Sequence, residues 1–363
     1  MAESPQPPRP LLVTADATLL DDVLRLAAAA DVELEVAHAA GPAPSSWATA
    51  PLVLVGADLA GDLVRGDPPR RRGVLLLNSG SEEDAGPEVW RQAVEIGAEQ
   101  VVPLAQSEGW LANRLADALD GDVPPAPTVC VVGGSGGAGA SVLATALALT
   151  GARLGYRPLL VDADPLGGGI DLVAGSEQVA GSRWTELAGA RGRVSATSLR
   201  GALPTLDGLT VLSWDRDGEF GVPADVMGAV LAAARRGTDL VVIDLPRNFD
   251  DAARVALACG DVTLLVVPAE VRASVAAARV VKAAREYTTD LRLVVRGPAP
   301  TGLPADTIAG SLGLPLAGRL RAEPDLAAAL DRAEPPTCRG RGPLTGFCTS
   351  FLTTLTGERR VAA

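Results

Sequence analysis

The stretch VCVVGGSGGAGASVLATALALT, from Val129 to Thr150, restricts the possible folds of this chain more than any other segment. A continuous apolar run leads into a glycine-rich turn, and a run rich in alanine and leucine follows at once. This order predicts a buried strand, a tight turn and a helix, which together open an α/β domain. In such a unit the backbone N–H groups of the turn and the N-terminus of the helix face an anion.

Three interpretations of the glycine turn stay open at this point. Residues 134–139 match GxGxxG, and Asp162 ends the next apolar strand at about the 20-residue spacing that a dinucleotide fold uses. The same turn is also a GxxxxG phosphate-binding loop without its lysine. A glycine-rich turn without any ligand is the third interpretation. In either ligand-bound case the contacting residues are Gly134, Ser135, Gly136, Gly137, Ala138, Gly139, Ala140, Ser141 and Val142.

Carboxylates at other strand ends distinguish the two ligand interpretations. In VDADP, Asp162 and Asp164 end an apolar strand, and in VVIDLP, Asp244 ends another. A carboxylate at Asp244 can hold the water shell of a Mg²⁺ ion opposite Ser141, whose hydroxyl is the usual direct ligand. A dinucleotide fold does not need the second acidic strand end. The pattern therefore favours a Mg²⁺-nucleotide site with Ser141 and Asp244 at the metal.

The chain contains two consecutive β-α series. In the first, we expect strands at 10–15, 32–38, 50–57, 73–78 and 98–104. In the second, we expect strands at 128–133, 157–164, 208–214, 238–245, 262–268, 291–297 and 315–320, with helices at 141–154, 222–236, 250–259 and 271–287. The predicted fold class is α/β, with two doubly wound parallel-sheet domains. We place these domains at 1–120 and 128–363, joined by a Pro-rich linker at 121–127.

Composition excludes several classes of function. The net charge of −12 argues against constitutive nucleic-acid binding. A single histidine, His38, excludes multi-histidine metal sites, and the only lysine is Lys282. The four cysteines show no CxxC spacing, which indicates buried free thiols in a reducing compartment. No signal peptide and no apolar run of about 18 residues is found, so we expect a cytoplasmic protein.

Several motifs in register resemble one known family. GGSGGAGAS, VDADP, VVIDLP and LLVVPAE follow the order found in the MinD/ParA group of deviant-Walker ATPases, over about residues 128–356. Together with a receiver-like N-terminal half, the chain resembles the actinobacterial septum-site-determining (Ssd) proteins and the related CpaE and TadZ localisation factors. The resemblance implies ATP and Mg²⁺ as cofactors and a face-to-face homodimer. It also implies positional regulation through division or pilus/secretion proteins, with recruitment to the septum, pole or membrane by those partners.

The chain departs from this family at the charged residues of its loop. The family's two loop lysines correspond to Ser135 and Ala140, and the remote Lys282 is not expected to replace either. We therefore expect ATP binding with weak or no hydrolysis. The alternative is an active, slow ATPase switch that dimerises with nucleotide, and a dinucleotide-binding protein is the outside alternative. Arg247 and Arg272 are candidates to compensate for the lysines.

Other site residues follow from the same resemblance. Asp164, with Asp162 in support, matches the switch aspartates that position Mg²⁺ and the attacking water, which makes these two the catalytic candidates. Arg296 occupies the place of an asparagine that holds adenine in many relatives. It could stack on a purine or be a solvated arginine at a strand end.

The N-terminal half lacks the chemistry of a phosphorylated receiver. A receiver requires an acidic cluster after its first strand, an aspartate that ends its third and a lysine after its fifth. Here the first strand ends at Asp16, Gly56 lies near the acceptor position and Asp58 comes two residues late. No lysine occurs in this half. We expect a degenerate receiver used for interaction.

The C-terminal segment carries an apolar stripe at helical spacing. Its members are Phe347, Phe351, Leu352 and Leu355. Basic residues occur only at 359 and 360, fewer than a membrane-binding amphipathic helix uses. We therefore expect the stripe to pack against its own domain.

Overall fold

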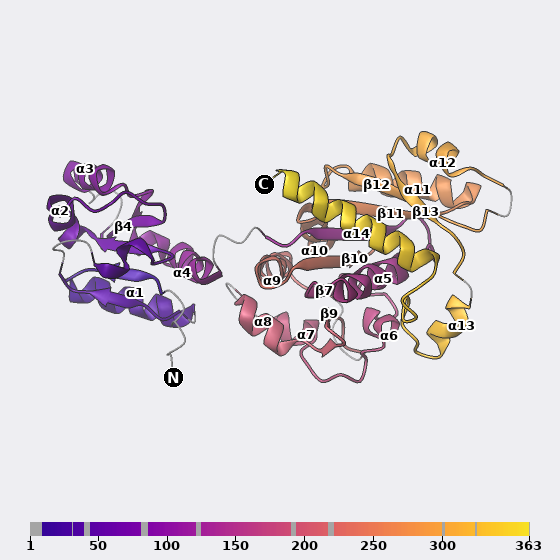
Figure 1. Cartoon of the computed structure of the whole chain (residues 1–363), viewed down its shortest axis with the longest axis horizontal. Helices are drawn as coiled ribbons and strands as arrows, with labels where there is room; N and C mark the ends of the chain where they lie inside the picture. Colours follow the sequence, from indigo (N-terminus) through magenta and orange to yellow (C-terminus); the bar gives the residue numbers. More distant parts are fainter. Residues whose placement is uncertain are drawn as a thin grey trace. The chain divides into compact units, whose positions relative to one another are not determined.

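The computed structural model describes residues 9–30, 32–39, 44–80, 86–120, 125–189, 194–216, 221–299, 302–323 and 325–362. The chain divides into two compact units, 1–123 and 124–363 (Figure 1). Part of the expected linker, 121–124, lies outside the described residues. Ala126, also expected in the linker, is instead buried in the second unit, where its N–H donates to the carbonyl oxygen of Arg235 at 2.7 Å. Ala126 therefore belongs to the second unit and not to a linker.

The first unit is a parallel sheet of order β2-β1-β3-β4-β5 with helices on both faces. The strands are β1 (Leu11–Val13), β2 (Glu35–Ala37), β3 (Val53–Gly56), β4 (Val74–Asn78) and β5 (Gln100–Pro103). The helices are α1 (Ala17–Ala29), a 3₁₀ turn η1 (Ser45–Ala48), α2 (Ala57–Arg65), α3 (Pro87–Ile96) and α4 (Leu104–Asp120). One apolar core lies against α1 and α4, and the other against α2 and α3. All five expected strands are present, each shorter than its apolar run.

The second unit is an eight-stranded sheet of order β13-β12-β11-β6-β10-β7-β9-β8. The strands are β6 (Thr128–Gly133), β7 (Pro158–Asp162), β8 (Thr205–Leu206), β9 (Leu209–Leu212), β10 (Leu240–Leu245), β11 (Val262–Pro268), β12 (Leu291–Arg296) and β13 (Leu316–Leu320). The expected parallel sheet is present, with an antiparallel addition at one edge. There β8, which was not expected, pairs antiparallel with β9 in a short hairpin around Asp207 and Gly208.

Ten helices are found among the described residues of this unit. They are α5 (Ala140–Arg153), α6 (Ile170–Ala174), α7 (Trp184–Leu187), α8 (Ala196–Ala202), α9 (Ala224–Gly237), α10 (Asp251–Ala258), α11 (Val271–Ala284), α12 (Ala305–Leu312), α13 (Leu326–Asp331) and α14 (Pro343–Ala362). The four expected helices correspond to α5, α9, α10 and α11. Helices α8 to α12 contribute to the core on one face of the sheet, and α5, α6 and α14 to the core on the other.

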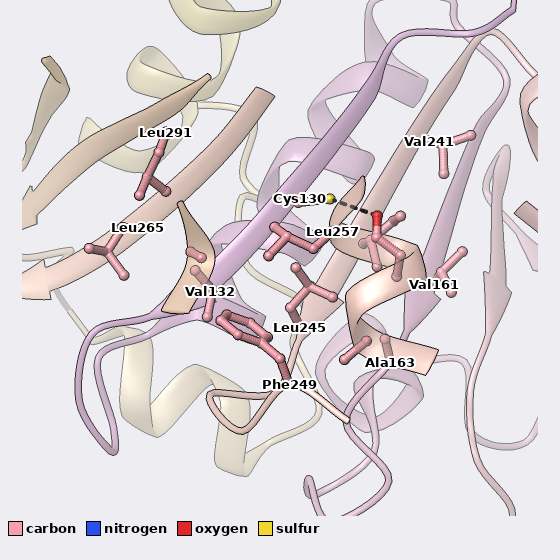
Figure 2. Close-up of a cluster of buried hydrophobic side chains, with 14 of the residues drawn as sticks. Cys130, Val132, Val161, Ala163, Val241, Leu245, Phe249, Leu257, Leu265 and Leu291 are labelled. Carbon is pink, nitrogen blue, oxygen red and sulfur yellow. Dashed lines mark hydrogen bonds between the residues drawn. The ribbon is translucent and has the colours of Figure 1, made fainter. Parts of the chain in front are cut away.

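Figure 2 shows why the strand runs of the second unit are continuously apolar. Side chains of β6, β7, β10 and β11, among them Val132, Val161 and Leu265, pack between the sheet and its helices. Cys130 lies in the same cluster, and its Sγ donates to the carbonyl oxygen of Ala256 at 3.5 Å. Burial raises the pKa of this thiol far above its ordinary value. Cys130 and Cys348 are buried free thiols as expected, whereas Cys338 is exposed, which corrects that prediction.

The C-terminal helix α14 lies alongside α5, as Figure 1 shows (yellow and purple). The expected stripe faces inward: Leu352 is fully buried, and Phe351 and Leu355 are less than a tenth exposed. Phe347 is only partly buried and stacks on Phe351 with ring centroids 6.0 Å apart. The prediction that this stripe packs against its own domain is confirmed. The side chains at 359 and 360 lie outside the described residues.

Candidate functional site: a glycine-rich cavity at the strand ends

The carboxyl ends of β6, β10 and β7 meet at one edge of the second sheet. Asp244 of β10 pairs in register with Val131 of β6 on one side and with Asp162 of β7 on the other. In an open α/β sheet, ligands bind outside these strand ends where the strand order reverses. Here β6 connects onward to β7 on one side of itself, while β11 lies on its other side. The glycine turn leaves β6 at this point.

The turn leaves its backbone donors free. Gly137 and Gly139 have φ angles of 67° and 95°, which an L-residue with a side chain rarely adopts. Gly139 is also the residue before α5, and no side chain caps this helix. Within the described residues, the N–H groups of Gly136, Gly137 and Gly139 donate to no protein acceptor. Unpaired amides at a helix N-terminus are the usual anion-binding arrangement.

A cavity of about 540 Å³ opens over the turn. Its lining residues are Gly133, Ser135, Gly136, Gly137, Ala138, Gly139, Ala140, Ser141, Val142, Asp164, Asp244, Leu245, Arg247, Arg296, Leu326, Ala327 and Leu330. Most of the candidates chosen from the sequence are therefore brought together. Lys282 and Arg272 lie on α11, and neither lines the cavity. The α13 residues were not foreseen, because DLAAALD carries no motif.

Gly134 has a packing role, unlike the neighbouring glycines, which line the cavity. It is buried and does not line the cavity. A Cβ atom there would lie 2.8 Å from both the Ala277 Cβ and the Val267 Cγ2 atoms. Gly134 is therefore required for α11 and β11 to approach the loop.

Asp162 also lies outside the cavity. Its side chain is 2% exposed and accepts hydrogen bonds from the N–H groups of Asp164 at 3.1 Å and Ile170 at 2.9 Å, and from the Ser213 hydroxyl at 3.1 Å. Burial raises its pKa to about 6, which these hydrogen bonds oppose. Asp162 thus shapes the loop between β7 and α6. Asp164 lines the cavity, and its carboxylate accepts from the N–H of Leu166 at 3.1 Å.

Asp244 is a buried carboxyl group at the floor of the cavity. Burial raises its pKa to about 8, from an ordinary 3.8. A hydrogen bond with the Ser141 side chain lowers this pKa, and the charges of Asp162 and Asp164 raise it further. No group of three or more metal-ligating side chains occurs among the described residues. A Mg²⁺ ion here would need a ligand's phosphates to complete its coordination, which is the usual arrangement for this ion.

The cavity fits a Mg²⁺-nucleotide on these observations. Free amides line the glycine turn, and a side chain added at Gly137 would project into open space. Ser141 and Asp244 place a hydroxyl and a carboxylate in the cavity, which are the oxygen ligands that a Mg²⁺ ion would need here. A second cavity of about 260 Å³ adjoins the first and shares Gly139, Val142, Arg296, Leu326 and Ala327 with it. This second space is mainly apolar, as a base-binding pocket is.

Among the described residues of the first unit, the aspartates near the strand ends are engaged in hydrogen bonds and do not form an open acidic cluster. The Asp58 carboxylate accepts hydrogen bonds from the N–H groups of Ala15 at 2.7 Å and Asp16 at 3.1 Å, and from the Thr14 hydroxyl at 2.9 Å. The carboxylate of Asp16 caps α1 instead. His38 is exposed, with its Nδ1 atom 3.3 Å from the carbonyl oxygen of Thr14.

The fold is similar to solved ParA and MinD structures. The ParA family ATPase from Chlorobium tepidum TLS gives a TM-score of 0.58 at 15% identity, covering 63% of this chain and 99% of that chain. MinD from Pyrococcus horikoshii OT3, complexed with Mg-ADP, gives 0.56 at 17% identity over 66% and 99%. A chain of the MinC:MinD complex of Aquifex aeolicus gives 0.54 at 22% identity over 64% and 96%. The second unit therefore has a MinD/ParA-like P-loop fold.

Sequence comparisons cover more of the chain than the second unit alone. The family model "Rv3660c-like, CheY-like N-terminal domain" matches residues 13–149. The chain is 41% identical to Rv3660c of Mycobacterium tuberculosis over 325 residues, 87% of this chain and 89% of that protein. It is 26% identical over 231 residues to a putative septum site-determining protein MinD of Nephroselmis olivacea, 61% of this chain and 84% of that protein. The chain belongs to the Rv3660c-like family.

Proposed function

We propose that this protein is a positional regulator whose MinD/ParA-type site has been retained for ATP binding, with weak or no hydrolysis. The observation that supports the proposal is the cavity itself, which keeps the amide cradle, Ser141, Asp244 and Asp164 but has no lysine among its described lining residues. Nucleotide-dependent proteins of similar fold include the MinD solved with Mg-ADP.

Each residue of the cavity has a distinct part in this proposal. The free amides of Gly136, Gly137 and Gly139 bind the phosphate chain, while Ser141 and Asp244 hold Mg²⁺, directly and through water respectively. The ion would neutralise phosphate charge. Asp164 is the group placed to orient a water molecule. Without an ammonium group the charge that develops during phosphoryl transfer is poorly stabilised, and losing one such contact typically costs about 10²–10³ in rate.

The names of the relatives support a proposed cellular role. We place this chain with the septum-site-determining Ssd proteins and the CpaE and TadZ localisation factors, as a regulator of division or of pilus/secretion machinery. The Nephroselmis olivacea relative carries a septum-site name, and the Aquifex aeolicus structure is a complex with a partner, MinC. We propose that the protein forms a homodimer and binds division or pilus/secretion proteins. We also propose that it is cytoplasmic and that these partners recruit it to the septum, pole or membrane. None of the helices in the described parts of the chain is long and apolar enough to span a membrane.

The proposal is tested by measuring binding of ATP, ADP and NAD to the purified protein, with and without Mg²⁺, alongside phosphate release. ATP binding with little or no turnover supports it. Binding of NAD alone would show a dinucleotide site, and binding of none of the three would rule out a nucleotide-dependent function.

Substituting Gly139→Val is expected to remove ATP binding. The φ angle of 95° at this position strains any residue with a side chain, and the added Cβ would contact the Arg296 side chain at 3.5 Å. Gly155→Val is the control, since Gly155 has a φ angle of 88° but lies at the far end of α5. Equal ATP affinity in the Gly139 variant and the wild type would rule out the loop as the binding site.

A slow ATPase switch is the second candidate, because Asp164 remains in the cavity. The slow switch differs from a regulator that binds ATP with weak or no hydrolysis in one measurable respect. A switch requires that the fraction of dimer, measured by light scattering, changes between ATP and ADP. A dimer fraction independent of nucleotide favours the first candidate, a regulator that binds ATP with weak or no hydrolysis.

A further inference from the structure

Two arginines lie beside the two places where the loop lacks a lysine. Arg247 follows β10, and its Nη2 atom would lie 3.8 Å from a Cβ at Gly136, which adjoins Ser135. Arg296 ends β12, and its Cδ and Nη1 atoms would lie 3.5 and 3.8 Å from a Cβ at Gly139, which adjoins Ala140. Both arginines line the cavity.

Neither arginine has a carboxylate partner. In the described parts of the chain, Arg247 and Arg296 form no ion pair, whereas arginines such as Arg157, Arg254 and Arg292 do. The Nε atom of Arg296 is buried and has no hydrogen-bond acceptor. A buried donor without an acceptor is unfavourable, and a native site that keeps one usually binds a further group there.

The surroundings of the two guanidinium groups point to an anion. The N-terminus of α5 carries a partial positive charge, and the unpaired amides of the turn point into the same space. Two unpaired cations next to a positive helix end repel one another when the cavity is empty. A polyphosphate between them would remove this repulsion and satisfy the free donors.

We propose that Arg247 and Arg296 replace the missing lysines as the cationic ligands of the nucleotide's phosphate chain. The inference rests on the proposed function and names the residues that supply its charge. A guanidinium group keeps its proton and offers two parallel N–H groups, so each arginine binds two phosphate oxygens where a lysine offers a single point charge. Arg296 also borders the second cavity, which places it between the phosphate and base ends of a nucleotide.

The test is isothermal titration calorimetry with Mg-ATP and with inorganic tripolyphosphate. Arg247→Ala and Arg296→Ala are each expected to lower the affinity for both ligands at least tenfold. Arg272→Ala is the matched control, because Arg272 is exposed on α11 and lies outside the cavity. Its affinities should equal those of the wild type. Thermal unfolding of each variant identifies any loss of binding that comes from loss of folding, and Arg296→Gln serves if Arg296→Ala does not fold.

A rescue experiment separates a direct role from a structural one. Adding Ala140→Lys to the Arg296→Ala protein returns an ammonium group to the same phosphate space and should restore most of the lost affinity. If the wild type binds Mg-ATP and both alanine variants bind it equally well, the arginines are not ligands, although the proposed function stands. If the wild type binds neither probe, the proposed function fails and this inference fails with it.

Discussion

Asp162 and Asp244 face each other in register on β7 and β10, and both side chains are buried. Asp162 is committed to the N–H groups and hydroxyl that surround it. Within the described residues, the Ser141 side chain is the one hydrogen-bonding neighbour of the Asp244 carboxyl group, and two further carboxylates raise the pKa of Asp244. Asp244 is therefore the carboxyl group with the most to gain from a cation, and Asp162 is a support for the loop.

Substituting Asp244→Asn is expected to stabilise the ligand-free protein at neutral and higher pH. The pKa of Asp244 is about 8 in the folded state against an ordinary 3.8, so folding opposes its ionisation. The wild type thus loses stability as the pH rises from 3.8 towards 8, and a neutral amide does not share this loss. The expected difference in melting temperature is several degrees near pH 8, at about 2–4 °C per kcal/mol for a domain of this size.

The measurement is thermal unfolding with a chelator present, from pH 4 to pH 8 at intervals. The increase in melting temperature of Asp244→Asn over the wild type should be absent near pH 4 and should grow as the pH rises. Asp251→Asn is the control, because its side chain is 84% exposed. A gain that is constant across the range would show that ionisation of Asp244 is not its cause.

Most residues of the site could be predicted from the sequence, for a physical reason. A glycine turn after a buried strand and aspartates at the ends of other strands must meet at one edge of a parallel sheet. Sequence could not separate Gly134 from Gly136, because packing against Ala277 and Val267 decides that difference. Nor could it choose between Arg247 and Arg272, since only the fold places one in the cavity and the other outside it.

At the scale of the elements, the sequence predicts the long buried strands well and the short elements poorly. The β6, β10 and β11 strands lie between two layers of helices, so most of their side chains are apolar and each run is easily recognised. The short helix α7 and the hairpin strand β8 gave no such signal. Tertiary contacts hold α7 in place: the Trp184 indole donates to the carbonyl oxygen of Asp162 at 2.7 Å and packs on Trp214.

In the N-terminal unit, Asp58→Ala on α2 is expected to cost about 1 kcal/mol of unfolding free energy. The substitution removes the acceptor of two amides and the Thr14 hydroxyl, but the groups are partly exposed, so water replaces some of the loss. Chemical denaturation measures the effect. Asp62→Ala on the same helix is the control, because its side-chain partner among the described residues is Arg65 on the surface, and it should change stability by less than about 0.5 kcal/mol. Equal costs in the two variants would contradict a stabilising role for the hydrogen bonds of Asp58 to the segment before α1.

At the scale of the whole molecule, the packing of α14 decides whether the C-terminal helix belongs to the core or is a separable anchor. Leu344, Cys348, Phe351, Leu352 and Leu355 join one apolar cluster with α5 and the central strands. Burial raises the pKa of the Cys348 thiol to about 12, as expected of a group without access to water. The helix covers a face of the sheet that would otherwise meet solvent.

Substituting Leu352→Ala is therefore expected to destabilise the second unit by about 2–5 kcal/mol, the usual cost of emptying a fully buried leucine site. Hydrogen exchange of the α5 and β13 peptides is the measurement, because it reports on this unit apart from the first and should become faster in the variant. Thr353→Ala, one residue along and exposed, should leave exchange unchanged. If α14 were instead a detachable membrane anchor, Leu352→Ala would reduce sedimentation with lipid vesicles and leave the exchange of α5 as it is in the wild type. The burial of its apolar stripe within the cluster argues for the first result.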